Sequence, residues 1–299
     1  MTQPRVAAFA RLANGNAAPE RVISGQASKL GRTIHGLVYD AVHDEIFVPN
    51  ALADAILVFR GGANGEEAPI RVIQGPCTGL VTPHSVSLDI QHDEILVASL
   101  NGRRINVFRR DANGNSPPLR MIMGSRTQLG HIVGIAVDPD KNLMAVANSK
   151  DILIFNRTDD GNVAPRARIA GPESGISDEP WEMQLYKGKI FLAASNHLHQ
   201  NLYEEGVKLR PDAKRVPYDP WLNPNLGFIG VWDITANGDI GPELKIGGAF
   251  SGLTHPTGLV LNPKDGEIYV SDSAKNDVLM YYLPQFFAQI DKLAGTPIK

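Results

Sequence analysis

Hydrophobic and polar positions alternate in short runs between residues 35 and 75 of the chain. The runs GLVYD, EIFVPN, AILVFR and APIRVIQG are rich in β-branched and aromatic residues, and Gly, Asn, Asp or Pro fills the gaps between them. Alternation over four to eight residues is typical of β-strands. We therefore expect a unit of four short strands over this range.

The same unit recurs along the chain. Its first strand is repeated as GLVYD, SVSLD, GIAVD, EMQLY and GLVLN, and the leading residues of these motifs are separated by 49, 49, 48 and 76 positions. A repeat of this length with four strands per unit is typical of propeller blades. The sequence predicts an all-β, five-bladed β-propeller with four-stranded blades, forming a single domain over residues 1–299. An Asn-Gly or Asp-Gly pair precedes each last strand and predicts a hairpin there.

The two ends of the chain each match part of a blade. Residues 5–25 resemble the second half of the unit, and residues 257–272 resemble its first half. We expect the N- and C-termini to complete one blade together, because closure leaves no open sheet edge. The segments VLMYYL (278–283) and RVAAFA (5–10) compete for the third strand of that blade. Residues 285–294 predict a short amphipathic helix.

The interval of 76 positions contains an insertion at residues 197–226. It is rich in proline, charged and aromatic residues, and it has no clear periodicity. Long loops in compact domains are usually functional. We expect this segment to cap one face of the propeller, at the end where the first strand of each blade begins.

Composition and charge exclude several classes of protein. The net charge of −3 gives no general attraction to nucleic acid or to anionic membranes, and the single cysteine rules out an internal disulfide framework. The N-terminus has no signal-peptide pattern, and no apolar run is long enough to span a membrane. We expect a cytoplasmic protein with neither nucleic-acid nor membrane partners.

The histidines are distributed unevenly over the predicted blades. His43 and His92 lie in equivalent turns between the first two strands. The other six map to the opposite end: His35 and His84 directly before the first strand, His131 and His255 two residues further upstream, and His197 and His199 at the start of the insertion. Because side chains alternate along an extended strand, a shift of two residues keeps them on one face.

Six imidazoles converging on one end of the propeller predict a transition-metal site. His35 and His84 alone would be explained as residues of the repeat, but His131, His255, His197 and His199 break its register. Nitrogen donors suit copper, zinc or iron, whereas calcium and magnesium prefer oxygen. Three ligands with an open position would favour catalysis, and a closed set would favour a structural role.

Further candidates for the site come from the insertion and from the start of the fourth unit. Tyr218 and Asp219 are candidate catalytic residues, since a metal-activated water needs a nearby acid or base. Trp181, Trp221 and Tyr203 are expected to form the apolar wall of a pocket for a small-molecule substrate. The alternative for all five is that they order a long loop.

Two other sets of residues follow the repeat and are expected to be structural. Asn50, Asn148, Asn196 and Asp272 end second strands and are predicted to hold loops through hydrogen bonds to the backbone. The recurring arginines are expected to be exposed residues that protect strand edges: Arg11, Arg60, Arg109, Arg157, Arg21, Arg71, Arg120 and Arg168.

The order GLVYD, EIFVPN, ILVFR and ANGNxAPxRxIxG resembles the blades of bacterial NHL-like propeller proteins over nearly the whole chain. That superfamily includes lactonases, lyases and interaction scaffolds, so the resemblance implies the fold and leaves the function open. Two hypotheses follow. The protein is a metal-dependent enzyme, with hydrolase, lyase and oxygenase chemistry all open, or it is a scaffold that binds a peptide or protein partner without a catalytic metal.

Overall fold

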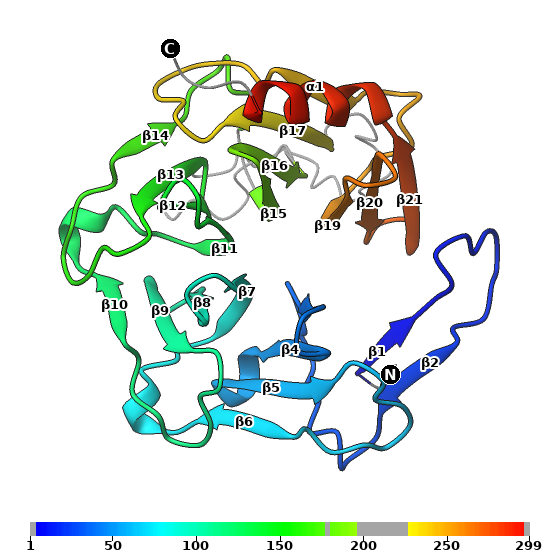
Figure 1. Ribbon diagram of the computed structural model, residues 1–299, viewed down its shortest axis with the longest axis vertical. Coiled ribbons are helices and arrows are strands. Elements are labelled where there is room, and N and C mark those ends of the chain that lie inside the picture. Colours follow the sequence, from blue (N-terminus) through cyan, green and yellow to red (C-terminus); the bar gives the residue numbers. More distant parts are fainter. Residues whose placement is uncertain (1–3, 177–179, 196–226, 296–299) are drawn as a thin grey trace, which may run out of the picture. The chain divides into compact units, whose positions relative to one another are not determined.

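The structure is a computed structural model that describes residues 4–176, 180–195 and 227–295. Within these ranges it consists of five successive antiparallel sheets, one two-stranded hairpin and one short C-terminal helix. Four of the five sheets have four strands and the last has three. Inside each sheet the strands follow one another in chain order, as in a propeller blade. The predicted all-β, five-bladed propeller arrangement is therefore confirmed (Figure 1).

The strands have the following bounds. The hairpin consists of β1 (Arg5–Ala8) and β2 (Arg21–Ser24). The first sheet is β3 (Val38–Asp40), β4 (Glu45–Asn50), β5 (Ala55–Arg60) and β6 (Arg71–Gln74). The second is β7 (Pro83–Asp89), β8 (Glu94–Ser99), β9 (Arg104–Arg109) and β10 (Arg120–Met123). The third is β11 (Ile132–Asp138), β12 (Leu143–Asn148), β13 (Asp151–Asn156) and β14 (Ala167–Ile169).

The fourth and fifth sheets complete the set. The fourth is β15 (Pro180–Tyr186), β16 (Lys189–Ala194), β17 (Phe228–Asp233) and β18 (Leu244–Gly247). The fifth is β19 (Pro256–Asn262), β20 (Glu267–Asp272) and β21 (Asp277–Tyr282), followed by α1 (Pro284–Ala294). The described residues also contain three short 3-10 turns, at Ala51–Ala53, Pro76–Thr78 and Ser125–Thr127.

Residue contacts divide the chain into two compact units. The first comprises Met1–Asn148 and Ile154–Arg166, and the second comprises Ser149–Leu153 and Ala167–Lys299. The division falls within β13. The predicted insertion at 197–226 lies outside the described residues, and the assignment of residues 1–299 to one domain stays a prediction.

In the first unit, the Asn-Gly and Asp-Gly pairs join neighbouring sheets. Asn64 and Gly65 lie in the connection between β5 and β6, which pair antiparallel as the hairpin signal predicts, although the connection is longer than a two-residue turn. The Asn64 Oδ1 accepts a hydrogen bond from the Val22 N–H at 3.0 Å, and Gly65 forms a parallel bridge with Ile23 of β2. Gly65 has φ of +67°, a left-handed conformation that glycine adopts without strain.

The same contact between a loop glycine and the outer strand of the preceding sheet recurs along the chain. Its bridges pair an outer-strand isoleucine with the glycine of the next connection: Ile23 with Gly65, Ile73 with Gly114, Ile122 with Gly161 and, in the second unit, Ile169 with Gly238. The pairs act between sheets because the loop glycine lets its backbone approach the outer strand of the preceding sheet.

Ion pairs join the first three sheets at the opposite end of their strands. Glu45 binds Arg71 of its own sheet through two oxygens, at 2.5 and 2.8 Å, and Arg110 of the next sheet at 2.9 Å. Glu94 repeats the pattern with Arg120 and with Arg157. The expectation that Arg71, Arg120 and Arg157 are exposed edge residues is therefore wrong, because each neutralises a nearly buried glutamate. Arg60 and Arg109, in contrast, are exposed as predicted.

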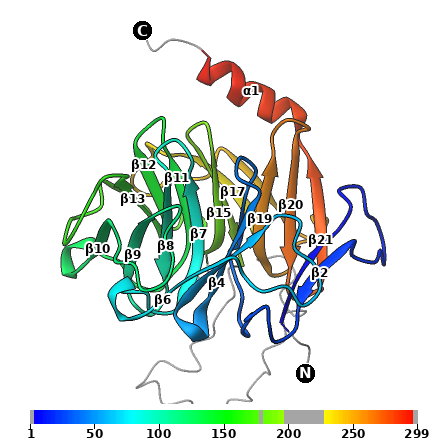
Figure 2. The same ribbon diagram turned by 60° about the horizontal axis from the view of Figure 1, so that its bottom comes forward.

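In the second unit, α1 covers one end of the apolar core. Its buried residues Phe287 and Ile290 pack with Phe191, Ile268 and Val270, and the rings of Phe287 and Phe191 stack with centroids 5.7 Å apart. The helix follows directly on β21 (Figure 2). The prediction of a short amphipathic helix at 285–294 is confirmed to within one residue.

The terminal strands answer the question of which segment takes the third position of the fifth sheet. β21, which contains most of the run VLMYYL, pairs with β20 from Asp277 to Tyr282. β1 pairs with β2, from Arg5 opposite Ser24 to Ala8 opposite Arg21.

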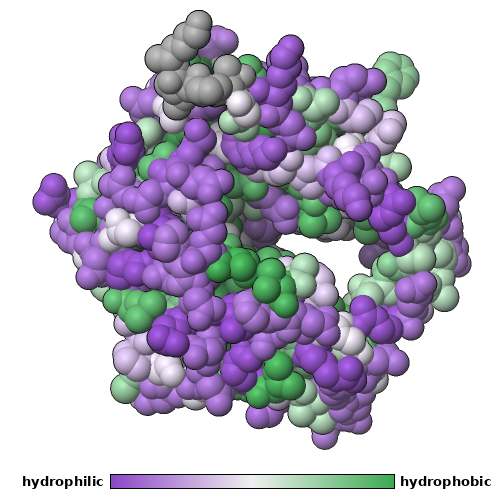
Figure 3. Space-filling model, viewed as in Figure 1, coloured by the Kyte–Doolittle hydropathy of each residue, from purple (hydrophilic) through white to green (hydrophobic). Residues whose placement is uncertain are grey.

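Most surface residues visible in Figure 3 are hydrophilic, and the hydrophobic ones form separate small groups, as on ordinary protein surfaces. The helices found in the described ranges are too short or too polar to cross a lipid bilayer.

Candidate functional site

His84 lies at a β-bulge near the start of β7. Pro83 pairs with Ser99 and Ser85 pairs with Ala98, so His84 is the extra residue between two rungs of the ladder. β11 has the same irregularity at Val133, and β19 has it at Thr257. A bulge redirects the side chain of the extra residue and is common beside active sites. The repeat thus provides a position at which a side chain is turned out of the regular alternation.

His35 and His84 are in contact, as their equal register in the repeat predicts. Their rings are stacked, with centroids 4.2 Å apart and an interplanar angle of 13°. His84 is 5% exposed, and His35 is partly buried. Two imidazoles at this distance repel each other when both are charged, so the arrangement favours their neutral forms.

The hydrogen bond of His84 identifies its tautomer. The Nδ1 of His84 lies 2.7 Å from the carbonyl oxygen of Val133 on the next sheet. Because a carbonyl only accepts, we assign the proton of the neutral ring to Nδ1, which leaves the lone pair on Nε2. Metal-binding histidines commonly have this arrangement, in which a backbone carbonyl orients the ring through the other nitrogen.

The pKa of His84 is lowered from 6.5 to about 4, mainly by burial; the nearby His35 and His131 also lower it, and the hydrogen bond to Val133 opposes them. Burial also lowers the pKa of His35. Both rings are therefore neutral at pH 7. Metal ligation requires this protonation state, because a protonated imidazole has no lone pair on the second nitrogen.

His131 and His255 each lie just before the first strand of a sheet, as predicted. His131 is exposed, and it is near enough to His84 to affect its pKa. In the second unit, the ring of His255 meets Trp181 edge to face, with centroids 5.8 Å apart. The structure thus brings Trp181, a predicted pocket residue, into contact with a predicted ligand.

The loop before His255 is held by Asp272. One oxygen of this carboxylate accepts from the N–H groups of Thr254 and His255, and the other accepts from Ala274 and Lys275. Asn148 holds Gly130 in the same way, and Asn50 donates to the Lys29 carbonyl. The predicted structural role of these residues is confirmed for all except Asn196, which the structure does not describe.

Not all of the predicted convergence can be followed in the structure. Across the described ranges, no group of three or more His, Cys, Asp or Glu side chains has the arrangement of a metal site. The remaining candidates fall outside those ranges: His197, His199, Tyr203, Tyr218, Asp219 and Trp221. The geometry therefore shows a pair of adjacent neutral imidazoles with a third histidine close by.

No family model and no curated protein matches this chain. The function therefore has to be argued from the chemistry of these side chains.

His43 and His92 form a different kind of contact. The Nδ1 of His43 lies 2.7 Å from buried Asp40, and that of His92 lies 2.8 Å from buried Asp89, three residues earlier in each case. These pairs close the turn between the first two strands, as expected for residues of the repeat. They provide a natural comparison for the histidines at the other end.

The sequence did not reveal two features of the first unit: the hydrogen-bond partner of His84 and the pocket lined by Arg103. The Val133 carbonyl is a backbone group, and its direction depends on the bulge in β11 rather than on any residue type. Arg103 lines a pocket near His131, and its only sequence signal is a break in the repeat: Asp54 occupies the equivalent position in the first sheet.

Proposed function

We propose that the protein is a metal-dependent enzyme that acts on a small organic substrate, with His35, His84 and His131 as ligands of a copper, zinc or iron ion. The observation that carries this proposal is the state of His84: a buried ring beside a second imidazole, with its Nδ1 directed at the Val133 carbonyl. A buried structural imidazole would also need a hydrogen-bond partner, so the second imidazole stacked beside it is the feature that favours a metal.

The fit of the residues to a transition metal rests on their donor chemistry. Nε2 of His84 carries the lone pair, burial keeps the ring neutral, and the Val133 carbonyl fixes its orientation. His131 is exposed and lies near enough to His84 to lower its pKa. A metal ion held there would supply Lewis-acid or redox chemistry to a bound substrate.

The surrounding residues would bind and orient the substrate. Under this proposal Tyr218 and Asp219 act as the acid or base that gives or takes a proton beside the metal, as the sequence predicts. Trp181, Tyr203 and Trp221 form the apolar wall that excludes water. For His255 and the two histidines of the insertion, the role as further ligands stays a prediction from the sequence.

The NHL-like character of the repeat supports an enzyme as one of the functions known for such propellers. The resemblance also allows a binding scaffold for a peptide or protein partner. Nitrogen donors stand where the lactonases of that superfamily are expected to place oxygen ligands for calcium, which favours a different metal and a different reaction.

Elemental analysis of the purified protein tests the proposal. After exposure to copper, zinc and iron in turn and removal of excess ion, we expect about one ion of the preferred metal per chain, as in other mononuclear sites. His84→Ala and His131→Ala should lose it while keeping the circular dichroism spectrum of the parent. His92→Ala is the matched control and should retain the metal, because His92 pairs with Asp89 in a turn of the repeat.

Two results would contradict the metal site. One is a protein that takes up no metal, and the other is a metal content unchanged in both His84→Ala and His131→Ala. Either would leave the binding scaffold as the better explanation.

A further inference from the structure

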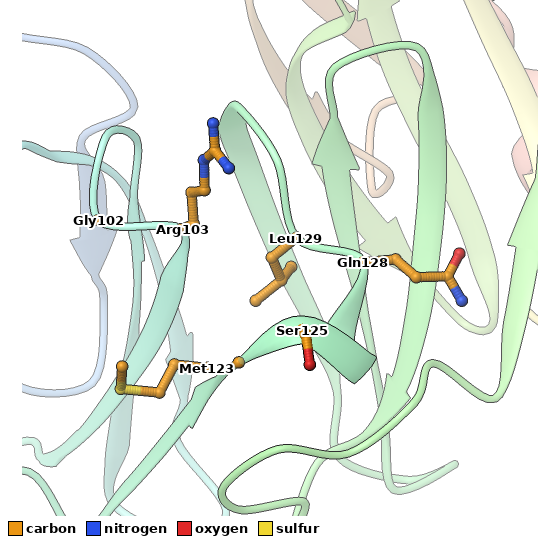
Figure 4. A pocket seen from close by; sticks show the side chains of 7 residues that line it. Gly102, Arg103, Met123, Ser125, Gln128 and Leu129 are labelled. Atoms are coloured by element: carbon orange, nitrogen blue, oxygen red, sulfur yellow. The ribbon is translucent and has the colours of Figure 1, made fainter.

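A pocket of about 330 Å³ opens in the first unit beside the segment that leads to His131 (Figure 4). One side comes from the connection between β8 and β9, and the other from the end of β10 and the turn that follows it. Its lining includes Gly102, Arg103, Met123, Ser125, Gln128 and Leu129. This volume is at the small end of the range for ligand sites.

The equivalent junction between the first and second sheets is closed by two hydrogen bonds. Oδ1 of Asp54 accepts from the Thr82 N–H at 2.7 Å, and Nε2 of Gln74 donates to the Ala53 carbonyl at 2.8 Å. These bonds tie the connection between the second and third strands to the segments beside it.

At the pocket, the residues 49 positions after Asp54 and Gln74 are of different types. Arg103 stands at the position of Asp54, and Met123 stands at the position of Gln74. A guanidinium has no acceptor and a thioether has no donor, so neither bond can form. The pocket is therefore a consequence of two substitutions within the repeat.

The backbone at Arg103 is unfavourable for arginine. Its φ is +48°, and the equivalent residues Asp54 and Asn276 have φ of +48° and +55°. Asp and Asn tolerate the left-handed region, whereas longer side chains rarely adopt it. The turn of the repeat sets this conformation, and an arginine has no local advantage there over aspartate or asparagine.

The charge of Arg103 is available to a ligand. Within the described ranges its side chain has neither a hydrogen-bond nor an ion-pair partner, while nearby Arg109 pairs with Asp111 and Arg110 pairs with Glu45. Leu129, only 7% exposed, projects into the space, and Met123 lies along it (Figure 4). Among the described residues that line it, the pocket combines the guanidinium of Arg103 with the apolar side chains of Leu129 and Met123.

We propose that this pocket binds a small organic acid, with its carboxylate on Arg103 and its apolar part against Leu129 and Met123. A guanidinium matches the two oxygens of a carboxylate, and the apolar floor favours an organic anion over an inorganic one. Leu129 and His131 are two residues apart, so their Cα atoms lie within about 7 Å. The identification of this acid as the enzyme's substrate rests on the proposed function; its binding does not.

Isothermal titration calorimetry with hexanoate, on protein treated with EDTA, tests the pocket without any metal. We expect hexanoate to bind and Arg103→Ala to weaken it at least about tenfold, the effect of one lost charge-assisted hydrogen bond. Arg103→Asp, which restores the residue of the neighbouring sheet, should abolish binding, and Arg103→Lys should recover part of it. Arg126→Ala removes a nearby charge outside the pocket lining and should have little effect.

Neutral hexanamide and inorganic phosphate complete the experiment, and both should bind much more weakly than hexanoate. Equal affinity for hexanoate in the parent and Arg103→Ala, no binding of hexanoate, or phosphate binding as tightly as hexanoate would each overturn the proposal. Because the protein is metal-free, a failed metal site leaves this result unaffected, and a failed pocket leaves the metal content unaffected.

Discussion

At the scale of single residues, His84 shows how one side chain acquires the properties of a ligand. Burial removes the stabilisation that water gives to the imidazolium, and the stacked ring of His35 adds repulsion. The Val133 carbonyl then selects the tautomer. Together these contacts hold a neutral ring in one orientation before any ligand arrives.

The lowered pKa of His84 predicts a pH dependence of stability in metal-free protein. Below pH 6.5 the unfolded chain binds a proton at His84, whereas the folded protein does not do so until about pH 4. Stability should therefore fall as the pH is lowered from 6.5 to about 4, by about 3 kcal/mol from this residue alone. Urea unfolding of EDTA-treated protein at several pH values measures it.

His84→Gln removes this titration, so its stability should depend less on pH than that of the parent over the same window. His92→Gln controls for the loss of an imidazole in a turn of the repeat. Parallel curves for the parent and His84→Gln would show that the ring is not held neutral by the fold.

The residues of the candidate site were predictable to different degrees. The contact between His35 and His84 follows from their equal register in a 49-residue repeat, which requires only that the repeat forms. The Val133 carbonyl was not predictable, because a bulge decides its direction. Arg103 could have been found by comparing repeats, since an arginine replaces an aspartate at a left-handed position.

At the scale of elements, neighbouring sheets of the first unit are joined at both ends of their strands. Glycines of the connecting loops form backbone bridges with the outer strand of the preceding sheet. Separately, Glu45 and Glu94 each form ion pairs with arginines of two sheets. The sequence showed these residues to recur but did not show their partners. An arginine on an outer strand looks like an edge residue until the position of the glutamate is known.

Glu94→Gln tests the ion pairs. The change leaves the nearly buried guanidinium groups of Arg120 and Arg157 without their main counter-charge, although Asp89 remains 3.4 Å from Arg157. We expect a loss of about 3 kcal/mol in the free energy of unfolding, at the low end for a broken buried pair.

Glu67→Gln is the matched control, because it breaks an exposed pair with Arg60 and should change stability little. Equal urea midpoints for Glu94→Gln and Glu67→Gln would mean that the ion pairs of Glu94 contribute no more to stability than an exposed pair does.

At the scale of the whole molecule, periodicity predicted the fold class because each unit repeats the same strand pattern at nearly constant spacing. The prediction was weaker where periodicity ends. Two terminal segments had equal claims to one strand position until the pairing of β20 with β21 was known. The insertion at 197–226 has no period, so its residue types were the only guide to its role.

Anomalous X-ray diffraction from crystals of metal-loaded protein, recorded at the absorption edge of the bound metal, tests the histidine site most directly. We predict a single strong peak within about 2 Å of Nε2 of His84, the usual length of a metal–imidazole bond, with His35 or His131 as a second ligand. A peak at His43 or His92, or no peak near His84 in crystals that contain the metal, would contradict it.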